Sequence, residues 1–160
     1  MYKILAIISF AFVLSFTTQA QEPVVYNGYK EMVAAAKQEI QLVSIADFHK
    51  MYVKAKSVGS KNLILLDIRT KEEYHAGSIP GALLIQRGVL ESHIEKDAVW
   101  EAFQHAKPKK DDQIVLYCRS GSRSALAAKT LKMLGYTNVL SLEGGWNGWH
   151  EKYPTQIALE

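Results

Sequence analysis

The chain has 160 residues, of which 48% are hydrophobic and 22% charged, and its formal net charge is +3. This length and composition are typical of one globular domain with one hydrophobic core. The charge is too small for the strongly basic surface that nucleic-acid-binding proteins use. We therefore expect no nucleic-acid partner.

The first twenty residues differ from the rest of the chain. Lys3 is their only charged residue, the run ILAIISFAFVLSF follows it, and TTQA ends at Ala20. This is the layout of a secretory signal peptide. The run is also shorter than the roughly 18 residues expected of a membrane-spanning helix. We expect cleavage after Ala20, a mature chain of charge +2 that is periplasmic or secreted, and no stable membrane insertion once the signal is removed.

The remaining chain alternates helical and strand patterns. Helices are expected over residues 29–41, 44–56, 88–106 and 124–135. Ser44 is expected to cap the second of these helices, with Asp47 three residues later, and Gly135 to close the last one. Continuous apolar runs at 62–68, 112–118 and 138–142 predict strands buried on both faces. This alternation indicates an α/β domain with a parallel sheet.

Cys118 is the only cysteine, and it ends the second strand pattern just before a helix. It therefore has no partner for an internal disulfide, and it is either a packed core residue or a reactive group. Ligands of parallel α/β sheets bind at the carboxyl ends of the strands. The small residues between Arg119 and Ser124 allow backbone amides to converge on the sulfur. Together with Arg119 and Arg123, these amides favour a nucleophilic thiolate that acts on an anion.

Loop length separates two chemistries that use such a cysteine. Cysteine phosphatases have five residues between the cysteine and an arginine, whereas four residues separate Cys118 from Arg123 here. Ser124 occupies the phosphatase arginine position. The shorter loop favours sulfur transfer over phosphoryl transfer.

Three segments together resemble a single-domain rhodanese: LLDIRTKEEYHAGSIPGA, VLYCRSGSRS and GYTNVLSLEGGWNGW. The resemblance implies an α/β domain with a five-stranded parallel sheet and helices on both faces. Together with the N-terminal pattern, it divides the chain into a signal peptide (1–20), an N-terminal helical extension with the first strand (21–43), a rhodanese domain (44–153) and a C-terminal tail (154–160). It implies no metal and no organic cofactor.

The resemblance also implies a sulfurtransferase in which Cys118 carries sulfur as a persulfide. The sulfur would come from thiosulfate or polysulfide and pass to cyanide, a small thiol or possible protein sulfur acceptors. The persulfide would be held by the loop residues Arg119, Ser120, Gly121, Ser122 and Arg123. A non-catalytic sulfur-carrier or partner-binding module is the alternative, and a cysteine phosphatase is less favoured. The physiological donor and acceptor and the oligomeric state are left open.

Four further residues are expected near this site. Asp67 and Arg69 end the first strand pattern, and Glu73 follows Arg69 by four residues, where a short helix would bring the two together. Arg69 is expected to bind substrate and Asp67 and Glu73 to support it, with a purely structural ion pair as the alternative. Arg87 is expected to face the site or to be a solvated loop residue.

Overall fold

The computed structural model describes residues 23–58 and 63–158, so the expected signal peptide lies outside the described residues. Its helices are α1 (Tyr29–Glu39), α2 (Ile45–Ser57), α3 (Lys71–His75), α4 (Leu90–His93), α5 (Asp97–Ala102), α6 (Ser122–Met133) and α7 (Gly145–Lys152). Its strands are β1 (Gln41–Val43), β2 (Leu63–Asp67), β3 (Leu83–Leu84), β4 (Gln113–Tyr117) and β5 (Val139–Leu142).

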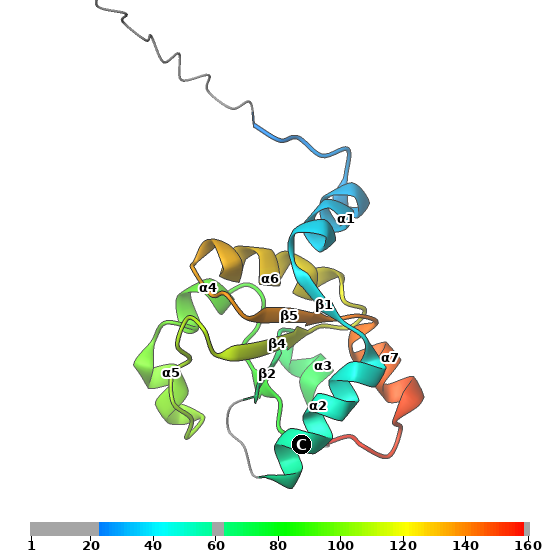
Figure 1. Cartoon of the computed structure of the whole chain (residues 1–160), viewed down its shortest axis with the longest axis vertical. Helices are drawn as coiled ribbons and strands as arrows, with labels where there is room; N and C mark the ends of the chain where they lie inside the picture. Colours follow the sequence, from blue (N-terminus) through cyan, green and yellow to red (C-terminus); the bar gives the residue numbers. More distant parts are fainter. Residues whose placement is uncertain (1–22, 59–62, 159–160) are drawn as a thin grey trace, which may run out of the picture.

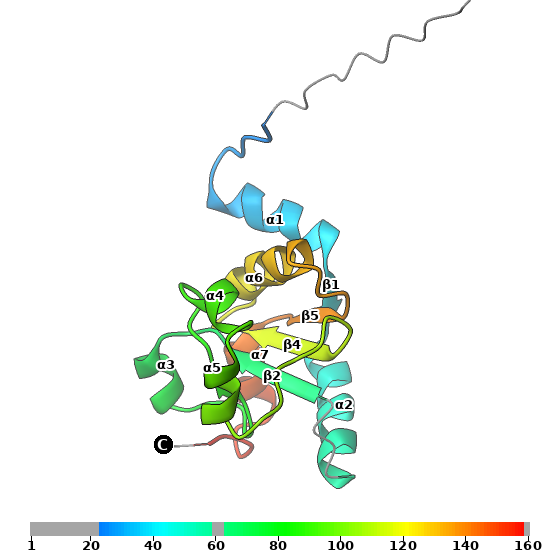
Figure 2. The same ribbon diagram turned by 90° about the vertical axis from the view of Figure 1, so that its left-hand side faces the viewer.

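The strands form one parallel sheet in the order β1-β5-β4-β2-β3. Figure 1 shows α1, α4 and α6 on one side of this sheet and α2 and α7 on the other. The view turned by 90° shows the same layers, with α1 lying across α6 (Figure 2). The predicted α/β domain with a five-stranded parallel sheet and helices on both faces is confirmed.

Side chains alternate between the two faces of each strand, so the sheet has two separate cores. Leu66, Leu116 and Cys118 pack into the core beneath α6. Leu65 and Tyr117 pack into the opposite core, beneath α2 and α7. The thiol therefore belongs to the α6 face, whereas its neighbour Tyr117 belongs to the other.

Local sequence signals account for most of the boundaries. The Ser44 hydroxyl accepts a hydrogen bond from the Asp47 amide at 3.1 Å, which confirms the predicted cap. Gly135 follows α6 with φ of 88°, the conformation expected of a residue that ends a helix. The single helix predicted over 88–106 is wrong, because the chain forms α4 and α5 instead. The buried Trp100 indole of α5 donates to the carbonyl of Ile94, which lies between the two helices, at 2.8 Å and satisfies it without a continuous helix.

The residues after α7 fold back against the domain. Ser78 and Ala158 exchange backbone hydrogen bonds of 2.9 and 2.8 Å. The Trp149 indole donates to the Gln156 carbonyl at 2.8 Å. These contacts fix the end of the described chain on the face of the sheet that carries α2 and α7. Over residues 23–58 and 63–158, no helix combines the length and the apolar character that crossing a membrane requires.

Candidate active site

The site is the loop between β4 and α6, which carries Cys118. Gly121 precedes the first residue of α6 and has φ of 91°, a conformation that glycine adopts without strain. The chain turns back there, and the Gly121 amide donates to Cys118 Sγ at 3.2 Å. The partial positive charge at the N-terminus of this 12-residue helix faces the same sulfur. Both features place partial positive charge beside the sulfur.

Two backbone amides of helix α7 donate hydrogen bonds to carbonyls of the cysteine loop. The Trp146 amide donates to the Cys118 carbonyl at 2.8 Å, and the Asn147 amide donates to the Arg119 carbonyl at 3.0 Å. This close approach depends on Gly145, because a Cβ there would lie less than 3.0 Å from the Cys118 carbonyl oxygen. With its carbonyls held by α7, the loop turns the Gly121 amide toward the sulfur.

Arg123 and Glu73 form an ion pair beside the thiol. Two guanidinium nitrogens of Arg123 donate to the two Glu73 carboxylate oxygens at 3.0 and 2.9 Å. Glu73 is oriented by a capping box at the start of α3, where its carboxylate also accepts from the Thr70 amide at 3.2 Å. The hydrogen bond from Arg123 lowers the pKa of Glu73. The Glu73 carboxylate in turn raises the pKa of Arg123, and the nearby Cys118 sulfur adds to that effect.

Arg69 and Asp67 lie on the other face of the sheet. Arg69 is 2% exposed and donates to the Asp67 carboxylate at 2.6 Å and to the Gly77 carbonyl at 2.7 Å. Its guanidinium lies over the rings of Trp146 and Tyr117, at 4.8 and 5.5 Å from their centres. Burial raises the pKa of Tyr117, so its hydroxyl stays neutral beside this pair.

These positions correct one expectation about the supporting residues. The predicted contact between Arg69 and Glu73 is wrong, because Arg69 pairs with Asp67 and Glu73 pairs with Arg123. The strand geometry explains the difference. Asp67 points away from the face that carries Cys118, and Arg69 follows it into the opposite core. This geometry favours the structural alternative for Asp67 and Arg69, and it links Glu73 to the cysteine loop.

Arg87 pairs with Glu91 at 2.5 Å, and Thr130 donates to the same carboxylate at 2.8 Å. Thr130 lies two turns along α6 from its start at Ser122. These contacts direct Arg87 toward the C-terminal half of α6 rather than toward the cysteine loop. Arg119, in contrast, is exposed, and no ion-pair partner for it occurs among residues 23–58 and 63–158.

Two serines that no sequence pattern singled out lie beside the thiol. Ser124, in the first turn of α6, places its hydroxyl 3.8 Å from Cys118 Sγ. The Ser141 hydroxyl of β5 donates to it at 2.8 Å. The available signal was Ser141 itself, a polar residue facing the α6 core from an otherwise apolar strand.

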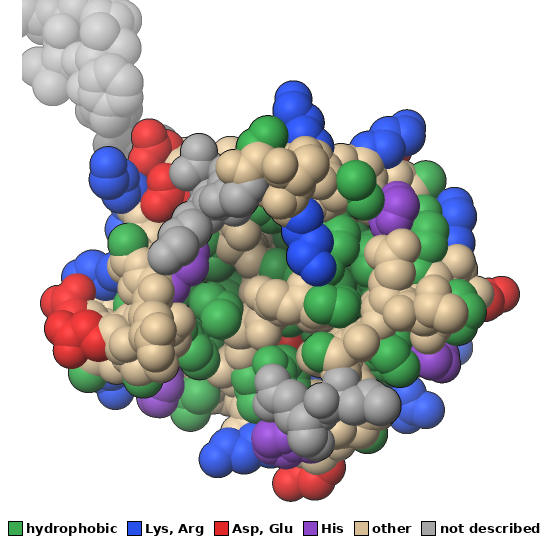
Figure 3. Space-filling model, turned by 90° about the horizontal axis from the view of Figure 1, so that it is seen from below, with side chains coloured by type: hydrophobic (Ala, Val, Ile, Leu, Met, Phe, Trp, Pro, Cys, Tyr) green, Lys and Arg blue, Asp and Glu red, His purple; other side chains and the backbone are tan. Residues whose placement is uncertain are grey.

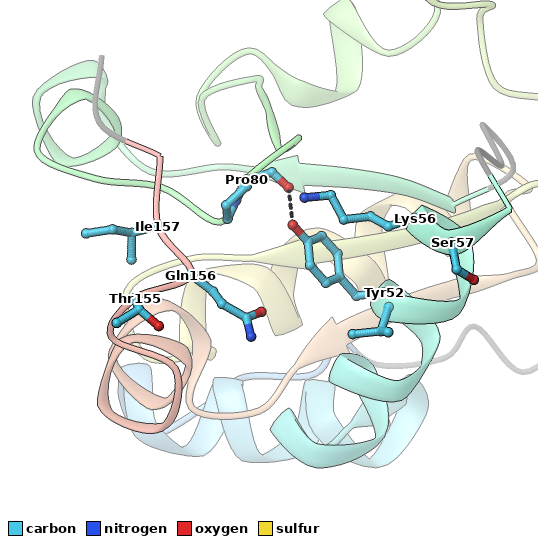
Figure 4. Close-up of a pocket in the computed structure, with 8 residues that line it drawn as sticks. Tyr52, Lys56, Ser57, Pro80, Thr155, Gln156 and Ile157 are labelled. Carbon is cyan, nitrogen blue, oxygen red and sulfur yellow. Dashed lines mark hydrogen bonds between the residues drawn. The ribbon is translucent and has the colours of Figure 1, made fainter.

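A separate cavity of about 560 Å³ lies between α2 and the residues after α7. Figure 4 shows its lining, in which Tyr52 donates to the Pro80 carbonyl at 2.9 Å and Gln156 approaches from the opposite side. Figure 3 shows a face on which apolar side chains gather centrally and charged ones lie mainly around them. Among the residues that the structure describes, those lining the cavity include no cysteine and no carboxylate. Across the described part of the chain, no three His, Cys, Asp or Glu side chains are grouped to hold a metal ion.

Comparisons with known proteins agree with this geometry. The family model described as the rhodanese-like domain matches residues 50–152. The mitochondrial putative thiosulfate sulfurtransferase of Schizosaccharomyces pombe is 33% identical over 116 residues, which cover 71% of this chain and 82% of that protein. The human thiosulfate:glutathione sulfurtransferase is 40% identical over 91 residues, covering 55% and 79%.

A solved structure from Rhodopseudomonas palustris, titled a protein of unknown function and possible tyrosine phosphatase, superposes with a TM-score of 0.62. It is 30% identical in sequence, and the match covers 83% of this chain and 96% of that one. The family match spans more than half of the chain and includes both the cysteine loop and the α7 residues that hold it. The chain belongs to the rhodanese-like domain family, with sulfurtransferases among its relatives.

Proposed function

We propose that the protein transfers a sulfane sulfur from thiosulfate or polysulfide to a thiol or cyanide through a persulfide on Cys118. The observation that carries this proposal is the Gly121 amide at 3.2 Å from Sγ, at the N-terminus of α6. An amide and a helix N-terminus stabilise a sulfur that carries negative charge. Cys118 is 1% exposed, and this low exposure favours a small, slender donor.

The proposed reaction has two displacements. The Cys118 thiolate attacks the outer sulfur of thiosulfate, an S–S bond forms at Sγ, and the bond to the sulfonate sulfur breaks. Its electron pair leaves with sulfite. An acceptor thiolate or cyanide then attacks the terminal sulfur of the persulfide, and the electron pair of that bond returns to Sγ. The cycle restores the thiolate and uses no external oxidant or reductant.

The two loop arginines have different proposed roles. Glu73 neutralises much of the charge of Arg123 through two hydrogen bonds, so Arg123 chiefly orders the loop. Arg119 is exposed and has no ion-pair partner among the described residues, so its charge is available to an incoming dianion. We therefore assign attraction of the donor sulfonate mainly to Arg119. A thiol acceptor is supported by the similarity to a human protein named for transfer to glutathione.

The test is intact-mass analysis of the purified protein after incubation with thiosulfate or with polysulfide, followed by cyanide, with Cys118→Ser as the control. The expected result is a gain of one sulfur mass on wild type alone, which cyanide removes as thiocyanate. If neither thiosulfate nor polysulfide adds a sulfur to the protein, the proposal is contradicted. Release of phosphate from an aryl phosphate by wild type, absent in Cys118→Ser, would instead support a cysteine phosphatase.

We also propose export, on the basis of the first twenty residues. Expression of the full chain in a bacterium should give a periplasmic protein whose N-terminus is Gln21, as measured by mass spectrometry of the isolated protein. A cytoplasmic product that retains Met1 or Lys3 would contradict this proposal.

A further inference from the structure

Ser124 and Ser141 are two buried hydroxyls that the proposed reaction does not yet use. Their exposed fractions are 0% and 1%. Ser141 lies on β5 in register with Leu116 of β4, and both side chains face α6. Cys118 follows Leu116 by two residues and faces the same way. The strand alternation therefore places Ser141 and the thiol on the same face of the sheet, where both contact Ser124 of α6.

Each serine has one hydroxyl proton, and the surroundings decide where each proton points. Among the described residues, Ser124 is the hydrogen-bond partner of the Ser141 hydroxyl, at 2.8 Å. Because Ser141 donates, the Ser124 oxygen acts as acceptor there and keeps its own proton for another partner. Two partners lie within reach: the Gly121 carbonyl at 3.2 Å and Cys118 Sγ at 3.8 Å.

The Gly121 carbonyl does not depend on Ser124. It already accepts the Ala125 amide at 3.1 Å as the first hydrogen bond of α6. The Ser124 proton can therefore turn to the sulfur without leaving a buried carbonyl unpaired, which would otherwise be costly. A hydrogen bond to an ionised acceptor is also stronger than one to a neutral carbonyl.

We propose that Ser141 and Ser124 form a relay, by which we mean a chain of two hydrogen bonds without proton transfer. In it, Ser141 donates to Ser124, and Ser124 donates to Cys118 Sγ while the sulfur carries negative charge. Ser124 is the donor to the sulfur, and Ser141 is a positioning residue that acts through Ser124. The proton stays on Ser124 throughout the reaction. When charge moves from Sγ to the terminal sulfur of the persulfide, the hydroxyl returns to the Gly121 carbonyl. The catalytic part of this inference rests on the proposed sulfur transfer.

The first measurement is the rate of Cys118 alkylation by iodoacetamide between pH 4 and pH 9, which does not require sulfur transfer. Ser124→Ala should move the midpoint of this profile to higher pH, because the thiolate loses a donor. Ser141→Ala should move it in the same direction by less. The charged groups beside the sulfur, Arg123 and Glu73, are unchanged in both variants. Ser78→Ala, which removes an equally buried hydroxyl on the segment that pairs with Ala158, should leave the profile unmoved.

The second measurement is the kcat and KM for thiosulfate. The loss of one hydrogen bond to the sulfur should lower kcat about tenfold in Ser124→Ala and about threefold in Ser141→Ala, with KM little changed. The double variant should equal Ser124→Ala alone, because Ser141 acts only through Ser124. Ser141→Thr keeps the hydroxyl and should restore most of the rate.

The outcomes separate the relay from the proposed function. Unmoved alkylation profiles in both alanine variants, or additive losses in the double variant, would overturn the relay. If the alkylation profiles of the alanine variants shift but wild type accepts no sulfur, the relay is supported and the proposed function is rejected. Urea unfolding of each variant identifies any that fails to fold, in which case the profile of the remaining single variant decides.

Discussion

The substitution Gly145→Ala tests whether the contact between α7 and the cysteine loop keeps that loop in its observed conformation. The φ of Gly145 is 54°, in the left-handed region, where an L side chain costs about 1–2 kcal/mol. A Cβ would lie less than 3.0 Å from the Cys118 carbonyl oxygen and 3.0 Å from the Arg119 carbonyl carbon. Both are backbone atoms, so this overpacking adds roughly 1–3 kcal/mol. We expect Gly145→Ala to lower the free energy of unfolding by roughly 2–5 kcal/mol in total.

Gly135 provides the matched control. Its φ of 88° is also left-handed, but nothing lies within 4 Å of a Cβ built there. Gly135→Ala should therefore cost only the conformational strain of about 1–2 kcal/mol. Urea unfolding measured for both variants isolates the contribution of the contact between α7 and the loop.

Gly145→Ala should also displace the loop carbonyls from the Trp146 and Asn147 amides, and with them the Gly121 amide that contacts Sγ. A displacement of about 1 Å at a reacting group can cost about 100-fold in rate. We expect a loss of that order in thiocyanate formation, and slower Cys118 alkylation, in Gly145→Ala but not in Gly135→Ala. Equal unfolding energies for the two variants, with unchanged Cys118 reactivity in Gly145→Ala, would refute the proposed support of the loop by α7.

Three further predictions concern the charged residues. Arg69→Met should lower the free energy of unfolding by about 3–5 kcal/mol, because it leaves the buried Asp67 charge unpaired. If this variant still folds, its Cys118 alkylation rate should equal that of wild type. A large loss of alkylation without destabilisation would contradict this prediction. Arg119→Ala should raise the KM for thiosulfate roughly five- to tenfold with little change in kcat, and a loss confined to kcat would count against its role in donor attraction. Arg123 lowers the pKa of Glu73 below 4.5, the ordinary value for glutamate. Wild type should therefore have a larger free energy of unfolding than Glu73→Gln above pH 4.5, and this difference should disappear as the pH falls through the lowered pKa of Glu73. A difference that does not change with pH would show that the ion pair is not the source of the extra stability.

Features encoded by neighbouring residues could be predicted from the sequence. The apolar runs gave β2, β4 and β5 because strands buried on both faces lack polar alternation. The Ser44 cap and Gly135 were recognised because each acts within a few residues of itself. The position of Cys118 at the end of a strand and before a helix followed from the order of these patterns. The expected roles of the loop residues stay predictions.

Features that depend on which strands become neighbours were not accessible in the same way. Ser141 meets Ser124 only because β5 pairs with β4, and Glu73 meets Arg123 across 50 residues of sequence. The predicted contact between Arg69 and Glu73 is wrong because the two residues do not share a helix. Arg69 continues the direction of β2, and its side chain enters the core beneath α2 and α7. The break between α4 and α5 depends on where the Trp100 side chain is buried, which a helical pattern does not specify.

The support of the cysteine loop by α7 has a consequence for the order in which the protein is made. Cys118 is synthesised before Trp146 and Asn147, whose amides hold the carbonyls of Cys118 and Arg119. A nascent chain that stops short of Asn147 can contain the whole loop and still lack the donors that fix its shape. The Cys118 thiol therefore reaches its native environment only when nearly all of the domain has been synthesised.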